Sequence, residues 1–212
     1  MGDSITEGFG LGNDSAIFYP TALNEYLGSA YSVINKGVTC SCVIDHEIDG
    51  EVMGLPYARQ PRYTEAIAAQ GDIYVIMLGT NDASDGYDPE TKNKEPLFNM
   101  IKQKEFFTPS YQAIIDDVRK AVPHAKIFLV TPIPIMKCIW PKHQERYLAK
   151  LLPMIKHLAK ENKTYFIDLH REFLLLPIEQ LENLYQEDGL HPNVVGAQVI
   201  ASIIAGFIKV KQ

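Results

Sequence analysis

The chain has 212 residues, of which 46 % are hydrophobic and 22 % are charged, and its net charge is −6. This length suits a single domain, 1–212, that buries about 70 % of the surface its unfolded form exposes. Because the net charge is negative, the sequence does not indicate a basic surface that would bind nucleic acid, and we expect no nucleic-acid partner. No apolar run reaches the roughly 18 residues that span a bilayer. No signal peptide is visible, and periplasmic, secreted and cytoplasmic locations all stay open, as does the oligomeric state.

The first eight residues contain a Gly-Asp-Ser turn with Ser4 as a candidate nucleophile. In a doubly wound fold such a turn follows a buried strand, yet only Met1 precedes Gly2. We therefore treat the first strand as missing from this sequence, and we expect several more apolar residues before Met1 in the natural protein. The next segment, 8–12, reads Gly-Phe-Gly-Leu-Gly, but its spacing does not fit a dinucleotide-binding loop.

Helices and strands then follow in alternation. Pro20 and Gly28 bound a predicted helix over 21–27, and residues 31–35 read as a strand. Residues 50–62 read as an irregular connection, and a second helix is expected over 63–70. Three continuous apolar runs predict buried strands, at 72–78, 126–130 and 165–169.

The helices expected between and after these strands cover 111–122, 143–162 and a last stretch capped by Asn193. Pro153 should kink or divide the second of them. Strands that alternate with helices indicate an α/β fold with a parallel sheet covered on both faces.

Candidate site residues follow the ends of two of these strands, where ligands bind in such sheets. Gly37 comes after the run 31–35 and Asn81 after 72–78, while Asp188 and His191 share one loop near the end of the chain. A serine hydroxyl needs a base to take its proton and donors to hold an oxyanion. The chain supplies candidates for both.

Taken in this order, the segments around Ser4, Gly37, Asn81 and Asp188–His191 resemble the SGNH or GDSL hydrolase family. The resemblance implies a three-layer α/β/α sandwich with a flavodoxin-like parallel sheet. It also implies Ser4 as nucleophile, Asp188 and His191 as its triad partners, and an oxyanion hole made by Ser4, Gly37 and Asn81. Cys40 is a departure from the pattern, because the family often has a second glycine there.

The activity that the resemblance implies is a serine esterase acting on small acyl esters through an acyl-enzyme intermediate. O-acetyl groups on carbohydrates are our first choice of substrate, and lysophospholipids or thioesters are the next. The alternative from another class is a non-catalytic protein that binds carbohydrate or lipid. If Ser4 is misplaced without the first strand, the chain would be inactive.

Several residues also have simpler interpretations. Each short motif alone is more often an ordinary turn, and Asp82 is assigned to local hydrogen bonding. The three cysteines, Cys40, Cys42 and Cys138, are interpreted as thiols without a metal, and no cofactor is expected. The segment 83–107 lacks a clear period and follows Asn81, so we expect it to shape the substrate pocket. Aromatic residues are candidates for contact with a sugar ring or for core packing: Tyr87, Phe98, Phe106, Phe107 and Trp140.

Overall fold

Three apolar segments form a parallel sheet at the centre of the computed structural model, which describes residues 1–48, 51–52, 54–83, 103–136 and 144–211. The strands are β3 Ile73–Met77, β4 Lys126–Val130 and β5 Tyr165–Ile167, in that order across the sheet. Ile73 lies opposite Lys126, and Phe128 lies opposite Tyr165. The three strands predicted from continuous apolar runs are confirmed.

Met1 and Gly2 extend this sheet beyond β3. The Met77 N–H donates to Met1 O at 3.1 Å, and the Val38 N–H donates to Gly2 O at 3.0 Å. Gly2 therefore bridges Met77 on one side and Gly37 on the other, both in parallel. The order of 37, 2, β3, β4 and β5 is that of a flavodoxin-like doubly wound sheet.

Residues 31–35, predicted as a strand, do not form one, and this edge pairs with Gly2 only at Gly37. A cavity of about 440 Å³ lies beside Met1, between residues 31–36 and residues 72–75. A strand forms only where a neighbouring strand pairs with it. In the described part of the chain, no strand pairs with residues 31–35. The expected apolar segment before Met1 stays a prediction.

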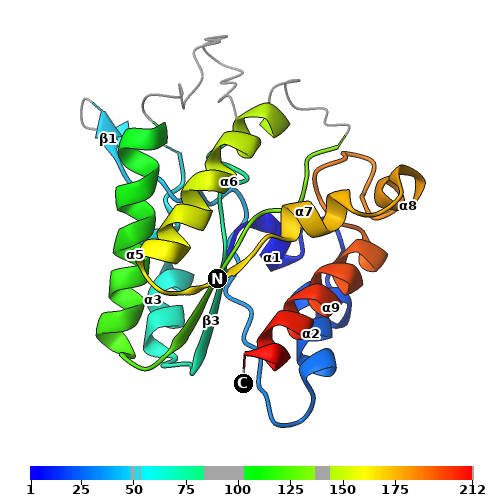
Figure 1. Cartoon of the computed structure of the whole chain (residues 1–212), viewed down its shortest axis with the longest axis horizontal. Helices are drawn as coiled ribbons and strands as arrows, with labels where there is room; N and C mark the ends of the chain where they lie inside the picture. The colour runs from blue at the N-terminus through cyan, green and yellow to red at the C-terminus, as the bar shows by residue number, and fades with distance from the viewer. Residues whose placement is uncertain (49–50, 53, 84–102, 137–143, 212) are drawn as a thin grey trace.

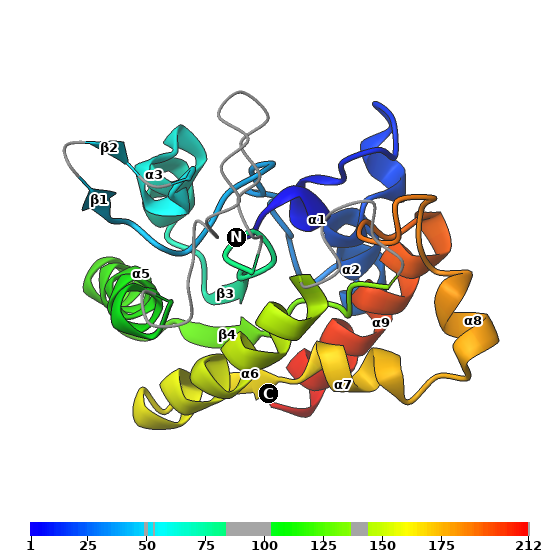
Figure 2. The same cartoon turned by 90° about the horizontal axis from the view of Figure 1, so that it is seen from above.

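Helices cover both faces of the sheet (Figures 1 and 2). One group consists of α3 Pro61–Ala68, α5 Thr108–Ala121 and α6 Gln144–Glu161, and the other of α2 Tyr19–Leu27, α7 Leu169–Leu174 and α9 Val194–Val210.

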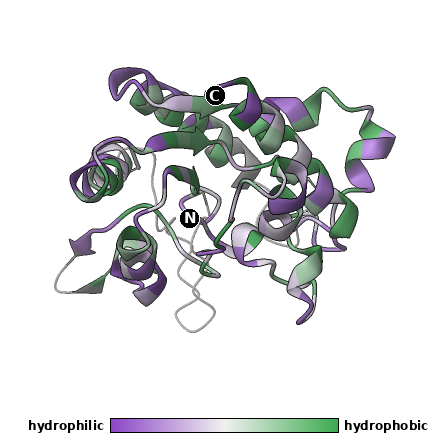
Figure 3. Cartoon of the chain, turned by 90° about the horizontal axis from the view of Figure 1, so that it is seen from below, coloured by the Kyte–Doolittle hydropathy of each residue, from purple (hydrophilic) through white to green (hydrophobic). Residues whose placement is uncertain are grey.

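β4 contributes side chains to the cores on both faces of the sheet, because successive side chains along a strand point to opposite faces. Ile127 and Leu129 pack in the core of the first group, whereas Phe128 and Val130 pack in the core of the second. In Figure 3 the central strands are accordingly mostly hydrophobic. The predicted three-layer α/β/α architecture is confirmed.

The long helices match their predictions with shifts of a few residues. α2 carries Pro20 in its first turn and ends at Gly28, and α3 starts at Pro61. α5 follows a single π-helical turn, η3 Gln103–Phe107. Pro153 does not divide α6, which continues on both sides of it. Proline has no N–H to donate to the carbonyl of Ala149, four residues earlier, but both residues are exposed, so water can reach that carbonyl.

Short elements connect these layers. They are α1 Ser4–Glu7, the 3₁₀ turns η1 Ser15–Ile17 and η2 Tyr57–Arg59, the antiparallel pair β1 Glu47–Ile48 and β2 Glu51–Val52, and α8 Ile178–Glu182. The Asn193 side chain accepts from the Gly196 N–H and caps α9, as predicted. Among the described residues, no helix has the length and apolar character to cross a bilayer.

Candidate active site

Ser4 opens the four-residue helix α1, two residues after the sheet position of Gly2. Asp3 caps the helix, because its Oδ1 accepts a hydrogen bond from the Ile5 N–H at 3.0 Å. A Cβ atom on Gly2 would lie 1.9 Å from Thr6 Oγ1, so only glycine lets α1 fold back onto the sheet. The turn thereby holds Ser4, which is 5 % exposed, at the carboxyl edge of the sheet.

His191 and Asp188 complete a hydrogen-bonded chain with Ser4. His191 Nε2 lies 2.9 Å from Ser4 Oγ, and His191 Nδ1 lies 2.6 Å from Asp188 Oδ2. The other carboxylate oxygen of Asp188 accepts from the N–H groups of Leu190 at 2.9 Å and His191 at 3.0 Å. One short loop therefore holds both side chains, and the structure brings all three predicted triad residues together.

The charge on Asp188 decides which ring nitrogen of His191 carries the proton. Partial burial raises the pKa of Asp188, but hydrogen bonds from the ring and from two backbone N–H groups outweigh it, so the pKa lies below its ordinary value. An ionised carboxylate only accepts, so Nδ1 donates to Asp188. Nε2 then accepts from the hydroxyl of Ser4, which is the arrangement of a general base beside a nucleophile.

Two other carboxyl groups near Ser4 have structural partners. Burial raises the pKa of Asp3 to about 7 and that of Asp82 to about 6. Asp82 accepts from the N–H groups of Val43 and Ile44 at 2.9 Å. These bonds give Asp82 a hydrogen-bonding role, as expected, but its partners lie 38 and 39 residues away in the sequence and are not local; they fix the chain that follows residues 35–41.

Asn81 follows β3 and lies next to the turn of residues 35–41. Its Nδ2 donates to Ser41 O at 2.9 Å. A primary amide has two hydrogens, so one of them stays available to a ligand. Its oxyanion role stays a prediction.

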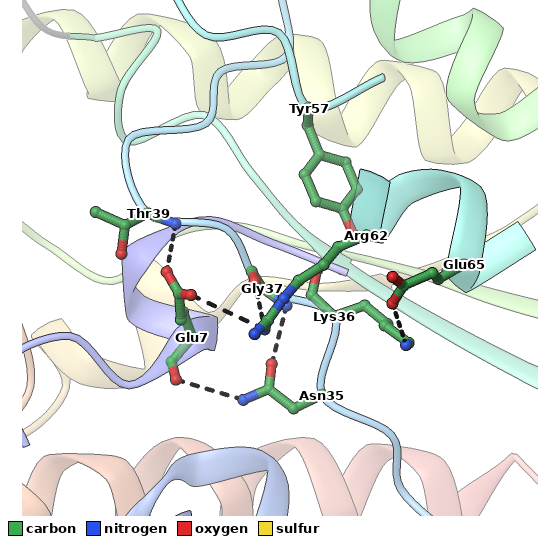
Figure 4. Close-up of polar contacts among 8 residues, drawn as sticks. All are labelled: Glu7, Asn35, Lys36, Gly37, Thr39, Tyr57, Arg62 and Glu65. Carbon is green, nitrogen blue, oxygen red and sulfur yellow. Dashed lines mark hydrogen bonds and ion pairs between the residues drawn. The ribbon is translucent and has the colours of Figure 1, made fainter. Parts of the chain in front are cut away.

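Gly37 was predicted to donate its N–H to an oxyanion, but in the structure its N–H and its carbonyl both have hydrogen-bond partners (Figure 4). Its N–H donates to Asn35 Oδ1 at 2.9 Å, and its carbonyl accepts from Arg62 Nη1 at 3.0 Å. A Cβ atom at this position would lie 2.3 Å from Glu7 N, so glycine is required for contact with α1. The donor role of Gly37 stays a prediction, and the bond to Asn35 counts against it.

The rest of this turn is fastened to α1 by Glu7 (Figure 4). Glu7 Oε2 accepts from the Thr39 N–H at 2.6 Å, and Glu7 Oε1 lies 3.9 Å from Arg62 Nη1. Cys40 comes next, with an exposed side chain and a φ of 62° in the left-handed region. Within the described residues, Cys40 N–H is the one amide of 37–41 without a hydrogen-bond partner.

The Phe9 ring lies 4.7 Å from the His191 ring and is 51 % exposed. Sequence reasoning missed it, because the glycines around it suggested only a loop. Of the aromatic candidates, Phe107 is buried in the core and Phe106 stacks on His46 at 3.7 Å. Tyr87, Phe98, Trp140, Cys138 and the segment 84–102 lie outside the described residues.

Fold and site together define an α/β protein whose serine, histidine and aspartate are arranged as in serine hydrolases. Residues 1–199 match the GDSL-like lipase/acylhydrolase family, and the chain belongs to that family. The resemblance to the SGNH or GDSL hydrolases is thereby confirmed.

Among individual proteins, an acetylxylan esterase of Xylanibacter ruminicola is 32 % identical over 213 residues. The match covers 99 % of this chain and 42 % of that protein, so the chain spans less than half of the relative's length.

Solved structures with the same fold include a carbohydrate acetylesterase family member from Sinorhizobium meliloti, with a TM-score of 0.69 and 19 % identity over 99 % of this chain and 95 % of that one. Another is a catalytic mutant of an acetylxylan esterase from Geobacillus stearothermophilus, with a TM-score of 0.67 and 20 % identity over 98 % of this chain and 91 % of that one.

Proposed function

We propose that this chain is a serine esterase that removes O-acetyl groups from carbohydrates through an acyl-enzyme intermediate. The observation that carries the proposal is the continuous hydrogen-bonded chain from Asp188 through His191 to Ser4 Oγ. A hydroxyl without such a base is a weak nucleophile at neutral pH. The proposal requires no cofactor.

In the first half of the reaction, Ser4 Oγ attacks the ester carbonyl and His191 Nε2 takes the hydroxyl proton. The imidazolium that forms is stabilised by the carboxylate of Asp188, 2.6 Å from Nδ1. When the bond between the carbonyl carbon and the alcohol oxygen breaks, His191 returns the proton to the leaving alcohol. The acetyl group is left on Ser4.

The second half reverses these roles with water. His191 Nε2 takes a proton from a water molecule, whose oxygen attacks the acetyl carbonyl. The bond to Ser4 Oγ breaks, and His191 returns the proton to that oxygen. Acetate leaves and the hydroxyl of Ser4 is restored.

We further propose that neutral donors hold the oxyanion in both halves. Ser4 N–H lies in the first turn of α1, where a helix provides no acceptor for it. Asn81 offers its second amide hydrogen. Among the described residues the N–H of Cys40 has no partner, and in the sequence it lies between Thr39, bonded to α1, and Ser41, bonded to Asn81. We favour this amide over that of Gly37, which already donates to Asn35.

The acetyl carbohydrate substrate is supported by the similarity to an acetylxylan esterase over 99 % of this chain. Lysophospholipids and thioesters would be cleaved by the same steps, because Ser4, His191 and Asp188 act on the acyl carbonyl that all these substrates share. Activity on acetylated xylan that exceeds activity on long-chain acyl esters would support the first substrate. The opposite preference would support the second.

The test of the function is hydrolysis of para-nitrophenyl acetate and acetylated xylan by the wild type and by Ser4→Ala. Ser15→Ala, at an exposed serine of η1, is the matched control. We expect turnover of both substrates by the wild type and the control, and nearly none by Ser4→Ala. Equal rates for the wild type and Ser4→Ala would end the esterase proposal. Ligand-induced thermal stabilisation without turnover would indicate a binding protein instead.

A further inference from the structure

Phe9 lies two residues after α1 and packs beside the catalytic base of the proposed mechanism. Its N–H donates to Ser4 O at 3.0 Å, and its carbonyl accepts from Gln186 Nε2 at 2.9 Å. Its ring is tilted by 40° against that of His191 at a centroid distance of 4.7 Å. Phe9 is thus bonded at once to the serine helix and to the segment that leads into the histidine loop.

The residues on either side of Phe9 must both be glycine. Gly8 has a φ of 96°, and a Cβ atom there would lie 2.5 Å from the ring of Phe18. Gly10 has a φ of 78°, and a Cβ atom there would lie 2.1 Å from Gln186 Oε1. Both positions therefore require glycine, and the backbone of Phe9 between them is held by its bonds to Ser4 and Gln186.

Phe9 is also exposed to solvent. Phe9 is 51 % exposed, whereas Phe107, Phe128 and Phe173 are buried in the core. A ring that packs on the base with one part and meets water with the rest has apolar surface to offer a ligand.

The position of His191 determines which part of an ester would meet this surface. Its Nε2 must give a proton to the leaving oxygen, so that oxygen comes within about 2.6–3.2 Å of Nε2. The alcohol part of the ester therefore lies on the side of His191, next to Phe9. The carbonyl oxygen goes instead to the donors at α1 and Asn81.

We propose that the Phe9 ring is the platform on which the sugar ring of the leaving alcohol stacks. A pyranose has a face of C–H groups, which is apolar and flat enough to pack on an aromatic ring. The inference rests on the proposed function and extends it, since it assigns the recognition of the carbohydrate to a named side chain. Phe9 would contribute to specificity for the alcohol and little to the chemical step.

The test compares two acetate esters that differ only in the alcohol, acetylated xylobiose and ethyl acetate. Phe9→Ala should lower kcat/KM for acetylated xylobiose about tenfold, mainly through KM, and change it less than about twofold for ethyl acetate. Phe9→Trp should keep the preference for the sugar ester. Tyr26→Ala, at an aromatic residue of α2 that is 43 % exposed, is the matched control.

An equal loss on both esters would overturn the platform and show that Phe9 only supports His191. Unchanged values for both esters would overturn it as well. Binding of acetylated xylobiose to Ser4→Ala, with and without Phe9→Ala, separates this inference from the esterase function because it needs no turnover. Weaker binding in the double variant supports stacking, and equal binding contradicts it; neither result depends on whether Ser4 acts as a nucleophile.

Discussion

The Asp188–His191 loop and the turn of residues 35–41 both lie beside α1, but they contribute different kinds of groups. The loop offers two side chains, aligned by hydrogen bonds of 2.6 and 2.9 Å that end at Ser4. The turn offers main-chain amides, most of which already have partners in Asn35, Glu7 and Val38. Roles carried by side chains are visible as residue types and spacings, whereas roles carried by amides depend on which of them the fold leaves free.

The largest effect that distinguishes the two regions should come from the loop. His191→Ala removes the base, and we expect kcat for para-nitrophenyl acetate to fall about a millionfold. His157→Ala, at an exposed histidine of α6, should leave kcat unchanged. Steady-state kinetics on both variants provide the check, and retention of more than about a hundredth of the activity would contradict the role of His191.

Asp188→Asn should have the next largest effect. The amide of asparagine no longer secures the Nδ1 proton of His191, so we expect kcat to fall about ten-thousandfold with little change in KM. Thermal unfolding should show that the variant still folds, since one oxygen still accepts from the N–H groups of Leu190 and His191. An activity near that of the wild type would mean that the carboxylate only stabilises the loop and does not orient His191.

On the other side of the site, Asn81→Ala tests the one oxyanion donor that is a side chain. Loss of one such donor should lower kcat about a hundred- to a thousandfold. Binding of a boronic acid that mimics the tetrahedral intermediate should weaken by a similar factor. If neither quantity changes, the oxyanion is held by main-chain groups alone and the contrast between the two regions is sharper than proposed.

Glu7 tests whether the turn needs its attachment to α1. Glu7→Ala removes the acceptor of the Thr39 N–H, and we expect kcat to fall about tenfold as the neighbouring Cys40 amide loses its position. Glu7→Gln keeps an acceptor and should restore most of the activity. Glu65→Ala, which breaks only an exposed ion pair with Lys36, is the control. A lack of rescue by glutamine would indicate that the charge, and not the position, matters.

The smallest effect concerns stability and Asp3. Its pKa is raised from 3.8 to about 7 by burial, so between these values the folded protein holds the proton more tightly than the unfolded chain. The unfolding free energy should therefore decrease as pH rises from about 4 through 7, and Asp82, raised to about 6, acts in the same direction.

Asp3→Asn keeps the cap on Ile5 and removes the charge, so it should flatten this slope. Urea unfolding at several pH values measures it. Asp14→Asn, at the exposed cap of η1, is the matched variant. A slope that stays the same in Asp3→Asn would assign the pH dependence to other groups.

Much of the sheet could be predicted from the sequence, because β3, β4 and β5 pack on both faces and, apart from Lys126, are apolar throughout. Residues 31–35 include Ser32 and Asn35 and are not buried, and they form no strand, since pairing depends on a neighbour that residue types do not reveal. The short α7 and α8 were not predicted, because five or six residues give too little periodicity.

The site divides in the same way. Ser4, Asp188 and His191 were implied by the resemblance of their segments to the SGNH or GDSL family, and the structure brings the three side chains into contact. Gly37 was expected as an oxyanion donor, but the sequence does not show that its N–H already donates to Asn35 or that it packs against the backbone of Glu7. Cys40 could not be singled out as a donor, because the sequence does not show its φ of 62° or its unpartnered N–H. Phe9 was missed because its contact with His191 is long-range.

The most direct test of the central claim is to trap the acyl-enzyme. Protein is mixed with para-nitrophenyl acetate, quenched in acid within the burst, and digested for mass spectrometry. We expect one acetyl group on the peptide that contains Ser4, its absence in Ser4→Ala, and a burst amplitude of one nitrophenol per chain. An acetyl group on another residue, or the same burst in Ser4→Ala, would contradict it.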